Sequence, residues 1–193
     1  NSRYNIALVA CENQKFQTVQ HYLEKAFEKY GLPEKILTDN GSPWGTSGNP
    51  PSYKTRGYTL MDKWLIQHGV KLIHGRPYHP QTQGKEERFH RTLKTELLHY
   101  NNYHSMEQCQ QSFDKWRYKY NHQRPHEAID FEMPAHIYKP SDKTYTKRVN
   151  YPSYPNSIAN RKVNPSGNIS YKKKNYKVGR AFIGENVALI PNI

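Results

Sequence analysis

The chain has 193 residues, and its 29 Lys and Arg outnumber its 16 Asp and Glu, which gives a formal net charge of +13. The two cysteines lie far apart and no apolar run approaches the roughly 20 residues of a membrane helix, so a disulfide framework, a structural zinc site and a membrane partner are excluded. A cation surplus on a chain with 16 Tyr, 6 Phe and 3 Trp indicates a folded cytoplasmic protein with a polyanionic partner, for which nucleic acid is the natural candidate.

The first part of the chain alternates strand and helix signals. Residues 4–10 are β-branched and apolar, which is typical of a buried strand. Asn13 is expected to cap the following helix, which Gly31 ends. Residues 35–38 form the next expected strand, which runs directly into Asp39.

The alternation continues beyond a long Gly/Pro/Ser-rich loop. A short helix is expected from Thr59, and residues 70–73 form another expected strand. Alternating strands and helices predict a layered α/β domain. After an irregular stretch at residues 75–84, a long helix should reach about residue 100, with these side chains facing the core: Phe89, Leu93, Leu97 and Tyr100.

The remaining elements indicate a second, smaller domain. Ser105 begins another helix, with Gln108 as its capping-box partner. A Pro-rich polar linker follows, interrupted by a helical turn near residues 135–138, and the last part alternates short β-like runs with turn signals. We therefore expect a core at residues 1–121, a linker at 122–158 and a small, incomplete β-rich DNA-binding domain at 159–193.

The C-terminal part carries most of the charge surplus. Residues 139–193 hold 11 basic and 2 acidic side chains. Lys172, Lys173 and Lys174 lie between two strand-like runs, as expected of a hairpin that contacts DNA phosphates. Three lysines are also common in a solvated loop that contacts no DNA, so both interpretations stay open.

Asp39 is the first candidate for chemistry. It follows a predicted strand, at the position where open α/β sheets place catalytic groups. Asn40 and Gly41 then permit a tight turn, although the same three residues are also ordinary turn chemistry.

Glu87 is the second candidate, on the helix that follows the loop His79-Pro80-Gln81-Thr82-Gln83-Gly84. On a helical wheel, Glu87, Arg91 and Lys94 share a face away from the apolar stripe. The simplest alternative is a solvated face on which Glu87 and Arg91 form an ion pair. The histidines, among them His74, match no metal-ligand spacing and are assigned no role.

The two segments together resemble a known family. Thr38-Asp39-Asn40-Gly41-Ser42, followed by residues 79–94, resembles the catalytic core of DDE-type transposases and retroviral-type integrases, in particular bacterial insertion-sequence transposases. The resemblance covers roughly residues 2–138. It implies an α/β fold, a ribonuclease H-like mixed sheet flanked by helices, followed by a small basic β-barrel-like domain.

The resemblance also implies roles for residues. Asp39 and Glu87, rather than Glu86, would be metal ligands in the cleavage and strand transfer of DNA, with two Mg²⁺ (or Mn²⁺) ions in the intact enzyme. The implied partners are double-stranded DNA, as element ends and target, and further copies of the full-length protein in a homo-oligomer, in a nucleoid-associated bacterial setting. The expected DNA-binding residues are Lys85, Arg88, Arg91, Lys94, Lys172, Lys173 and Lys174.

One departure from the family bears on activity. The family's first catalytic Asp lies on its first strand, and this chain has no Asp before Asp39. Because Ser2-Arg3-Tyr4 resembles the start of the family's second strand, the first strand is expected to precede Asn1. An N-terminally truncated chain of this kind should bind DNA without joining strands. The alternatives are a non-catalytic DNA-binding remnant or regulator derived from a transposase, and an RNA-binding protein.

Overall fold

The computed structural model describes residues 2–39, 41–45, 57–74, 84–149, 151 and 153–190. The chain divides into two compact units, residues 1–33 with 77–145 and residues 34–76 with 146–193, and each is described by itself. The expected loops before Tyr58 and before Gly84 fall largely outside the described residues.

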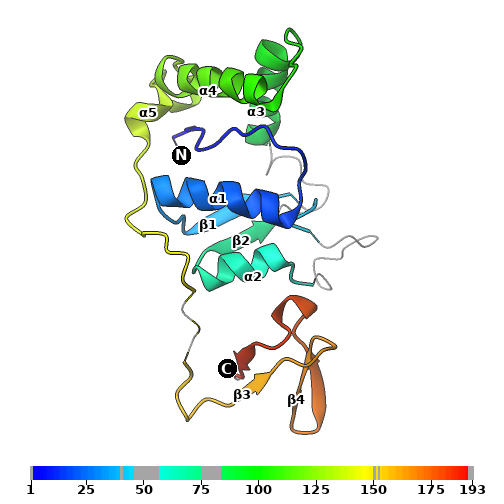
Figure 1. The fold of residues 1–193 in the computed structure, drawn as a ribbon. Coiled ribbons are helices and arrows are strands. Elements are labelled where there is room, and N and C mark those ends of the chain that lie inside the picture. Colours follow the sequence, from blue (N-terminus) through cyan, green and yellow to red (C-terminus); the bar gives the residue numbers. More distant parts are fainter. Residues whose placement is uncertain are drawn as a thin grey trace. The chain divides into compact units, whose positions relative to one another are not determined.

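The first unit contains the amphipathic helix α1 (Phe16–Tyr30), which the sequence predicts (Figure 1). Asn13 was expected to be the N-cap of this helix, but it forms a turn just before the helix instead. The Asn13 Oδ1 accepts hydrogen bonds from the Lys15 N–H at 3.0 Å and from the Thr18 hydroxyl at 2.8 Å. An Asn side chain can bind the backbone two residues ahead, so the predicted cap lies two residues before the actual N-cap, Lys15.

Gly31 ends α1 and lets a distant segment approach it. Its φ is 77° and its ψ is 171°, a backbone conformation that essentially only Gly adopts. A Cβ at this position would lie 2.9 Å from the Lys143 carbonyl oxygen and still closer to that of Ser141. The Leu32 N–H donates to the Lys143 carbonyl at 2.7 Å, which fixes this segment against the end of the helix.

The expected strand at residues 4–10 is not formed, and this prediction is wrong. Polar side chains of α4 (Met106–His122) bind the backbone of this segment in place of a neighbouring strand. Asn121 bonds with both the N–H and the carbonyl of Asn5, Gln110 with the Leu8 carbonyl and the Ala10 N–H, and Arg117 with the Ile6 carbonyl. Backbone groups need partners but not necessarily a strand, so an apolar run alone did not require a sheet.

The long basic helix is formed by α3 (Gly84–Leu93), which continues into a π-helical turn, η2 (Lys94–Leu98). Phe89 packs edge-on against α4, with its ring centroid 5.5 Å from that of Trp116 and 5.4 Å from that of Tyr120. These contacts confirm that Phe89 faces the core.

The prediction that Tyr100 also faces the core is wrong, because this side chain is 80 % exposed. A π-helical turn closes its hydrogen bonds over five residues instead of four. It therefore rotates every later residue relative to a regular α-helical wheel. The wheel is reliable as far as Leu93, which is buried, and fails beyond η2.

Helix α4 begins after Ser105, as the sequence predicts, but only half of the expected capping box is formed, because the Gln108 side chain binds the N–H of His104 and not that of Ser105. The Ser105 hydroxyl accepts a hydrogen bond from the Gln108 N–H at 3.2 Å, and the Gln108 side chain accepts one from the His104 N–H at 2.9 Å. Two short helices follow, η3 (Glu127–Ile129) and α5 (Pro134–Ile137). The latter is the helical turn expected in this region.

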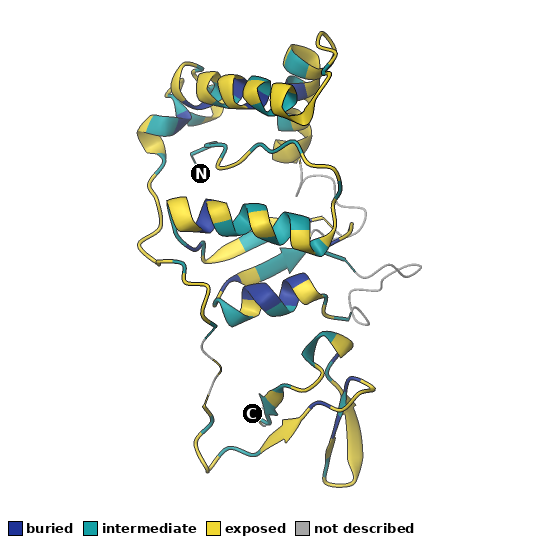
Figure 2. Cartoon of the chain, in the orientation of Figure 1, coloured by how far each residue is buried: buried dark blue, intermediate teal, exposed yellow. Residues whose placement is uncertain are grey.

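The second unit contains the strands that carry the candidate site. Strands β1 (Lys35–Thr38) and β2 (Lys71–His74) form a two-stranded parallel sheet in which Thr38 lies opposite His74. Helix α2 (Leu60–Gln67) supplies fully buried side chains, Met61 and Leu65, to the same unit. Figure 2 shows that α2 is one of the most buried helices of the chain.

The C-terminal residues of this unit form two antiparallel pairs. Strand β3 (Asn160–Lys162) pairs with β6 (Asn186–Ala188), and β4 (Asn168–Tyr171) pairs with β5 (Lys174–Lys177), with η4 (Arg180–Phe182) between β5 and β6. Among the described residues these pairs are separate two-stranded sheets and do not close a barrel, so the barrel stays a prediction.

These residues contact the start of α2 within the second unit. The Lys63 ammonium forms an ion pair with the Glu185 carboxylate at 2.6 Å. The Tyr58 ring meets that of Phe182 edge-on, with the centroids 5.1 Å apart. No helix in the described part of the chain is both long and apolar enough to cross a membrane.

Candidate active site and nucleic-acid interface

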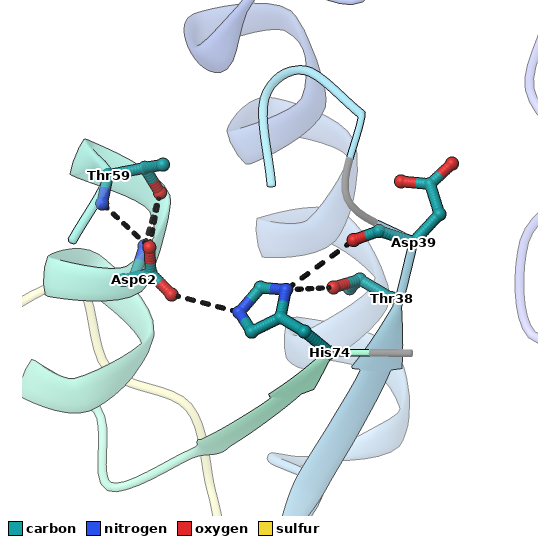
Figure 3. Close-up of polar contacts among 5 residues, drawn as sticks. All are labelled: Thr38, Asp39, Thr59, Asp62 and His74. Atoms are coloured by element: carbon teal, nitrogen blue, oxygen red, sulfur yellow. Dashed lines mark hydrogen bonds and ion pairs between the residues drawn. The ribbon is translucent and has the colours of Figure 1, made fainter. Parts of the chain in front are cut away.

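Asp39 lies directly after the last residue of β1, as the sequence predicts. Its side chain is exposed, and its Oδ1 accepts a hydrogen bond from the Gly41 N–H at 3.0 Å. Figure 3 shows the carboxylate pointing away from the side chains that surround its backbone. It is therefore accessible to a ligand from solvent.

A hydrogen-bonded network lies behind Asp39 (Figure 3). The His74 Nδ1 is 3.1 Å from the Thr38 hydroxyl, and its Nε2 is 3.3 Å from Asp62 Oδ1. No role was expected for His74, and Asp62 was not among the candidate residues. The strand expected at residues 70–73 ended one residue before His74, so the pairing of Thr38 with His74 is visible only in the folded chain.

Glu87 lies in the first turn of α3 in the other unit, and its side chain is exposed. Acidic side chains favour this end of a helix, because the free N–H groups there carry partial positive charge. Among the residues that the structure describes, Glu87 forms no ion pair with Arg91, so the salt bridge offered as the simplest alternative is not formed. Its carboxylate is available to a metal ion or a partner.

The expected DNA-binding residues of the helix are all exposed. Lys85, Arg88 and Arg91 lie on α3, and Lys94 begins η2. Exposed cations on one helix provide phosphate contacts that carry no sequence information by themselves. This surface is therefore suited to contacts with phosphates.

The far end of this helix is held by one ion pair. Glu96 accepts two hydrogen bonds from the Arg124 guanidinium, one of them at 2.9 Å, and a third from the Trp116 indole N–H at 3.0 Å. The Arg124 contacts, foremost, lower the pKa of the Glu96 carboxyl, while burial opposes them. The pair connects η2 to α4 and to the residues that follow it.

The second group of cations forms the tip of the β4–β5 hairpin. Lys172 and Lys173 both have positive φ, 48° and 62°, as a two-residue hairpin turn requires. Gly or Asn would adopt this conformation more easily, and other residues pay about 1–2 kcal/mol each. Two exposed lysines at such a cost are consistent with a contact role for this tip.

The donor atoms of the two carboxylates fit a hard divalent cation. Mg²⁺ prefers carboxylate oxygens and keeps several waters, which suits exposed side chains such as those of Asp39 and Glu87. The two residues belong to different units. Within the described residues, no three His, Cys, Asp or Glu side chains gather into a metal-binding group. The residue types suit metal coordination, and the structure shows each carboxylate separately, one in each unit.

Protein-family comparisons agree with the resemblance to transposases and integrases that the sequence motifs indicate. Residues 1–80 and residues 68–134 match two models that are each described as an integrase core domain. Residues 158–193 match the C-terminal domain of IS481 family transposases. The chain therefore belongs to the integrase and transposase proteins that share the integrase core domain, which implies a ribonuclease H-like α/β fold.

Individual relatives are of both viral and bacterial origin. The Pol-related polyprotein of the mouse intracisternal A-particle MIA14 is 39 % identical over 80 residues, which is 42 % of this chain and 8 % of that protein. The Gag-Pro-Pol polyprotein of mouse mammary tumor virus is 34 % identical over 80 residues, 41 % of this chain and 4 % of that protein.

A bacterial relative is a 31.7 kDa uncharacterised protein of insertion element IS407 from Burkholderia multivorans. It is 26 % identical over 117 residues, which is 61 % of this chain and 38 % of that protein. The chain thus spans well under half the length of these curated relatives. Membership of this group supports DNA integration or transposition as the general function.

Proposed function

We propose that this chain takes part in DNA transposition by metal-dependent cleavage and strand transfer of phosphodiester bonds, with Asp39 and Glu87 as metal ligands. The observation that carries the proposal is the exposed carboxylate of Asp39 at the carboxyl end of β1, within the residues that match an integrase core domain. Glu87 lies within the second matching segment.

The two carboxylates have a chemical task that suits their exposure. Each would hold Mg²⁺ or Mn²⁺ through oxygen, and two such ions, when bound, supply Lewis-acid stabilisation of the attacking and leaving oxygens. Asp39 already has one oxygen oriented by the Gly41 N–H, which limits rotation of the carboxylate. The side chains thus provide negative charge and orientation at a solvent-accessible edge.

The DNA partner follows from the distribution of cations. Lys85, Arg88, Arg91 and Lys94 would contact the phosphates near the candidate ligand Glu87 on the same helix. Lys172, Lys173 and Lys174 would add contacts from the hairpin tip. Double-stranded DNA, as element ends and target, is the proposed partner, and pairing two ends would require a homo-oligomer.

A third carboxylate is needed for the family's full ligand set. Residues 1–38 contain no Asp, so we expect these 193 residues by themselves to bind DNA without joining strands. A non-catalytic DNA-binding protein derived from a transposase is the second candidate function. The exposed cations of α3 and of the hairpin tip would serve this function equally well, because DNA binding requires no metal ligand.

The test uses the protein from its complete reading frame and DNA that spans both flanks of its own gene. We expect Mg²⁺-dependent cleavage that frees 3′-hydroxyl ends, followed by their joining to a target plasmid. Asp39→Asn and Glu87→Gln should each abolish both steps. Their matched controls, Glu34→Gln just before β1 and Glu86→Gln beside Glu87, remove equal charge from exposed positions and should retain activity.

Each other outcome is informative. Cleavage that survives either Asp39→Asn or Glu87→Gln contradicts the assignment of the ligands. DNA binding without any cleavage by the complete protein supports the non-catalytic candidate. Preference for structured RNA over duplex DNA would reject both.

A further inference from the structure

The carboxyl ends of β1 and β2 meet at Asp39. The two strands are parallel and in register, so Thr38 lies opposite His74, and Asp39 is the next residue beyond the pair. Among the described residues the ladder ends at this pair, since β1 ends at Thr38 and β2 at His74. Side chains that contact the end of β1 can therefore help to fix the backbone of Asp39.

His74 bonds in both directions from this point (Figure 3). Its Nδ1 lies 3.1 Å from the Thr38 hydroxyl and 3.4 Å from the Asp39 carbonyl oxygen. Its Nε2 lies 3.3 Å from the Asp62 carboxylate on α2. The imidazole thus connects a helix to the end of a strand that is separate in sequence.

Asp62 is a rigid anchor for this imidazole. It is 4 % exposed, and its second oxygen accepts hydrogen bonds from the Thr59 N–H at 2.6 Å and the Thr59 hydroxyl at 2.7 Å. These bonds belong to the capping box that begins α2. A buried carboxylate held in this way has a single orientation to offer.

The hydrogen-bonding partners of the His74 imidazole indicate which of its ring nitrogens carries the proton. The Asp62 carboxylate can only accept, so Nε2 carries a proton and donates it. In the neutral ring Nδ1 is then an acceptor, and the Thr38 hydroxyl donates to it. Thr38 is 6 % exposed, so this bond also satisfies an otherwise buried hydroxyl. In this tautomer Nδ1 and the Asp39 carbonyl oxygen are both acceptors, so their 3.4 Å approach is not a hydrogen bond, and His74 acts on the Thr38–Asp39 peptide through the Thr38 hydroxyl.

We propose that His74 is a positioning residue for Asp39. His74 links the Thr38–Asp39 peptide to the buried Asp62 and so helps to fix the direction of the Asp39 carboxylate. The inference rests on the proposed function, in which Asp39 is a metal ligand. The carboxylate itself is exposed, and its bond to the Gly41 N–H constrains only one oxygen. Fixing the peptide limits where the Asp39 side chain starts and so restricts the directions open to its carboxylate, as outer partners of metal ligands commonly do.

The test measures Mn²⁺ affinity, by the electron paramagnetic resonance of free Mn²⁺, on the protein from its complete reading frame. His74→Ala should weaken Mn²⁺ binding by about 10-fold to 100-fold. Thr38→Val keeps the shape of the side chain, removes its hydroxyl and should weaken binding in the same direction. His74→Gln can still donate to Asp62 and should lose less than His74→Ala.

The matched control is His68→Ala. His68 belongs to the same unit and its ring nitrogens also bond, to the carbonyls of Trp64 at 2.8 Å and Thr146 at 3.2 Å. It should leave Mn²⁺ affinity unchanged. An equal loss in His68→Ala would assign the effect to general stability and overturn the inference.

Asp39→Asn separates this inference from the proposed function. If Asp39→Asn leaves Mn²⁺ affinity unchanged, the metal assignment itself fails. If Asp39→Asn weakens binding but both His74→Ala and Thr38→Val do not, only the positioning role fails. Should His74→Ala not fold, Thr38→Val and His74→Gln decide the question, and full Mn²⁺ affinity in both would overturn the inference.

Discussion

Replacing Lys172, Lys173 and Lys174 together by Ala should lower the salt dependence of DNA binding. All three side chains are exposed; Lys172 and Lys173 form the hairpin turn with positive φ, and Lys174 begins β5. Each phosphate contact adds about 0.9 to the slope of log affinity against log salt, so three contacts add about 2.7. Between roughly 50 and 200 mM salt, the unmodified chain should lose about 40-fold more affinity than the triple variant.

The assay is fluorescence anisotropy with a labelled duplex, repeated over a salt series. A triple variant of Lys15, Lys25 and Lys29, which are exposed on or beside α1, removes the same charge from a surface with no expected DNA contact. It should keep the original slope. A slope that is unchanged in the hairpin variant, or lowered equally in both variants, refutes the reasoning and removes the hairpin from the interface.

Two further predictions concern the first unit. Gly31→Ala should lower the free energy of unfolding by about 2–5 kcal/mol, because backbone strain adds to the contact with the Lys143 carbonyl. At the control position Gly69, a Cβ meets no described atom within 4 Å, so Gly69→Ala should lower it by only about 1–2 kcal/mol. Equal losses of unfolding free energy in calorimetry would contradict the close approach at Gly31. Because the pKa of Glu96 is lowered in the folded chain, its contribution is present above the ordinary value of 4.5 and is lost as the pH falls below it. Glu96→Gln should flatten this part of a thermal-stability profile by at most about 1 kcal/mol, given the partial exposure of the pair; an unchanged profile would show that the pair contributes nothing.

The candidate ligands could be predicted because local signals surround them. The strand at residues 35–38 and the helix that carries Glu87 both have the predicted type, and the resemblance to a known family selects Asp39 and Glu87 from among 16 acidic residues. Turn chemistry at Gly31 likewise marked the end of α1 correctly.

The remaining features depend on contacts between distant segments. Residues 4–10 are apolar enough for a strand, but the side chains of Gln110, Arg117 and Asn121, about a hundred residues later, bind their backbone instead. The exposure of Tyr100 follows from a π-helical turn that no residue pattern announced. His74 was overlooked because its partners come from β1 and α2, which only the folded chain brings together.

The proposal to be tested most directly is that Asp39 and Glu87 are both metal ligands. Iron(II) bound in place of Mg²⁺ on the complete protein, with ascorbate and peroxide, generates radicals that cut the polypeptide near the ion. The account predicts cuts close to both residue 39 and residue 87, suppressed by excess Mg²⁺ and lost in Asp39→Asn. Cuts at only one of the two positions, or cuts that Mg²⁺ does not suppress, would contradict it.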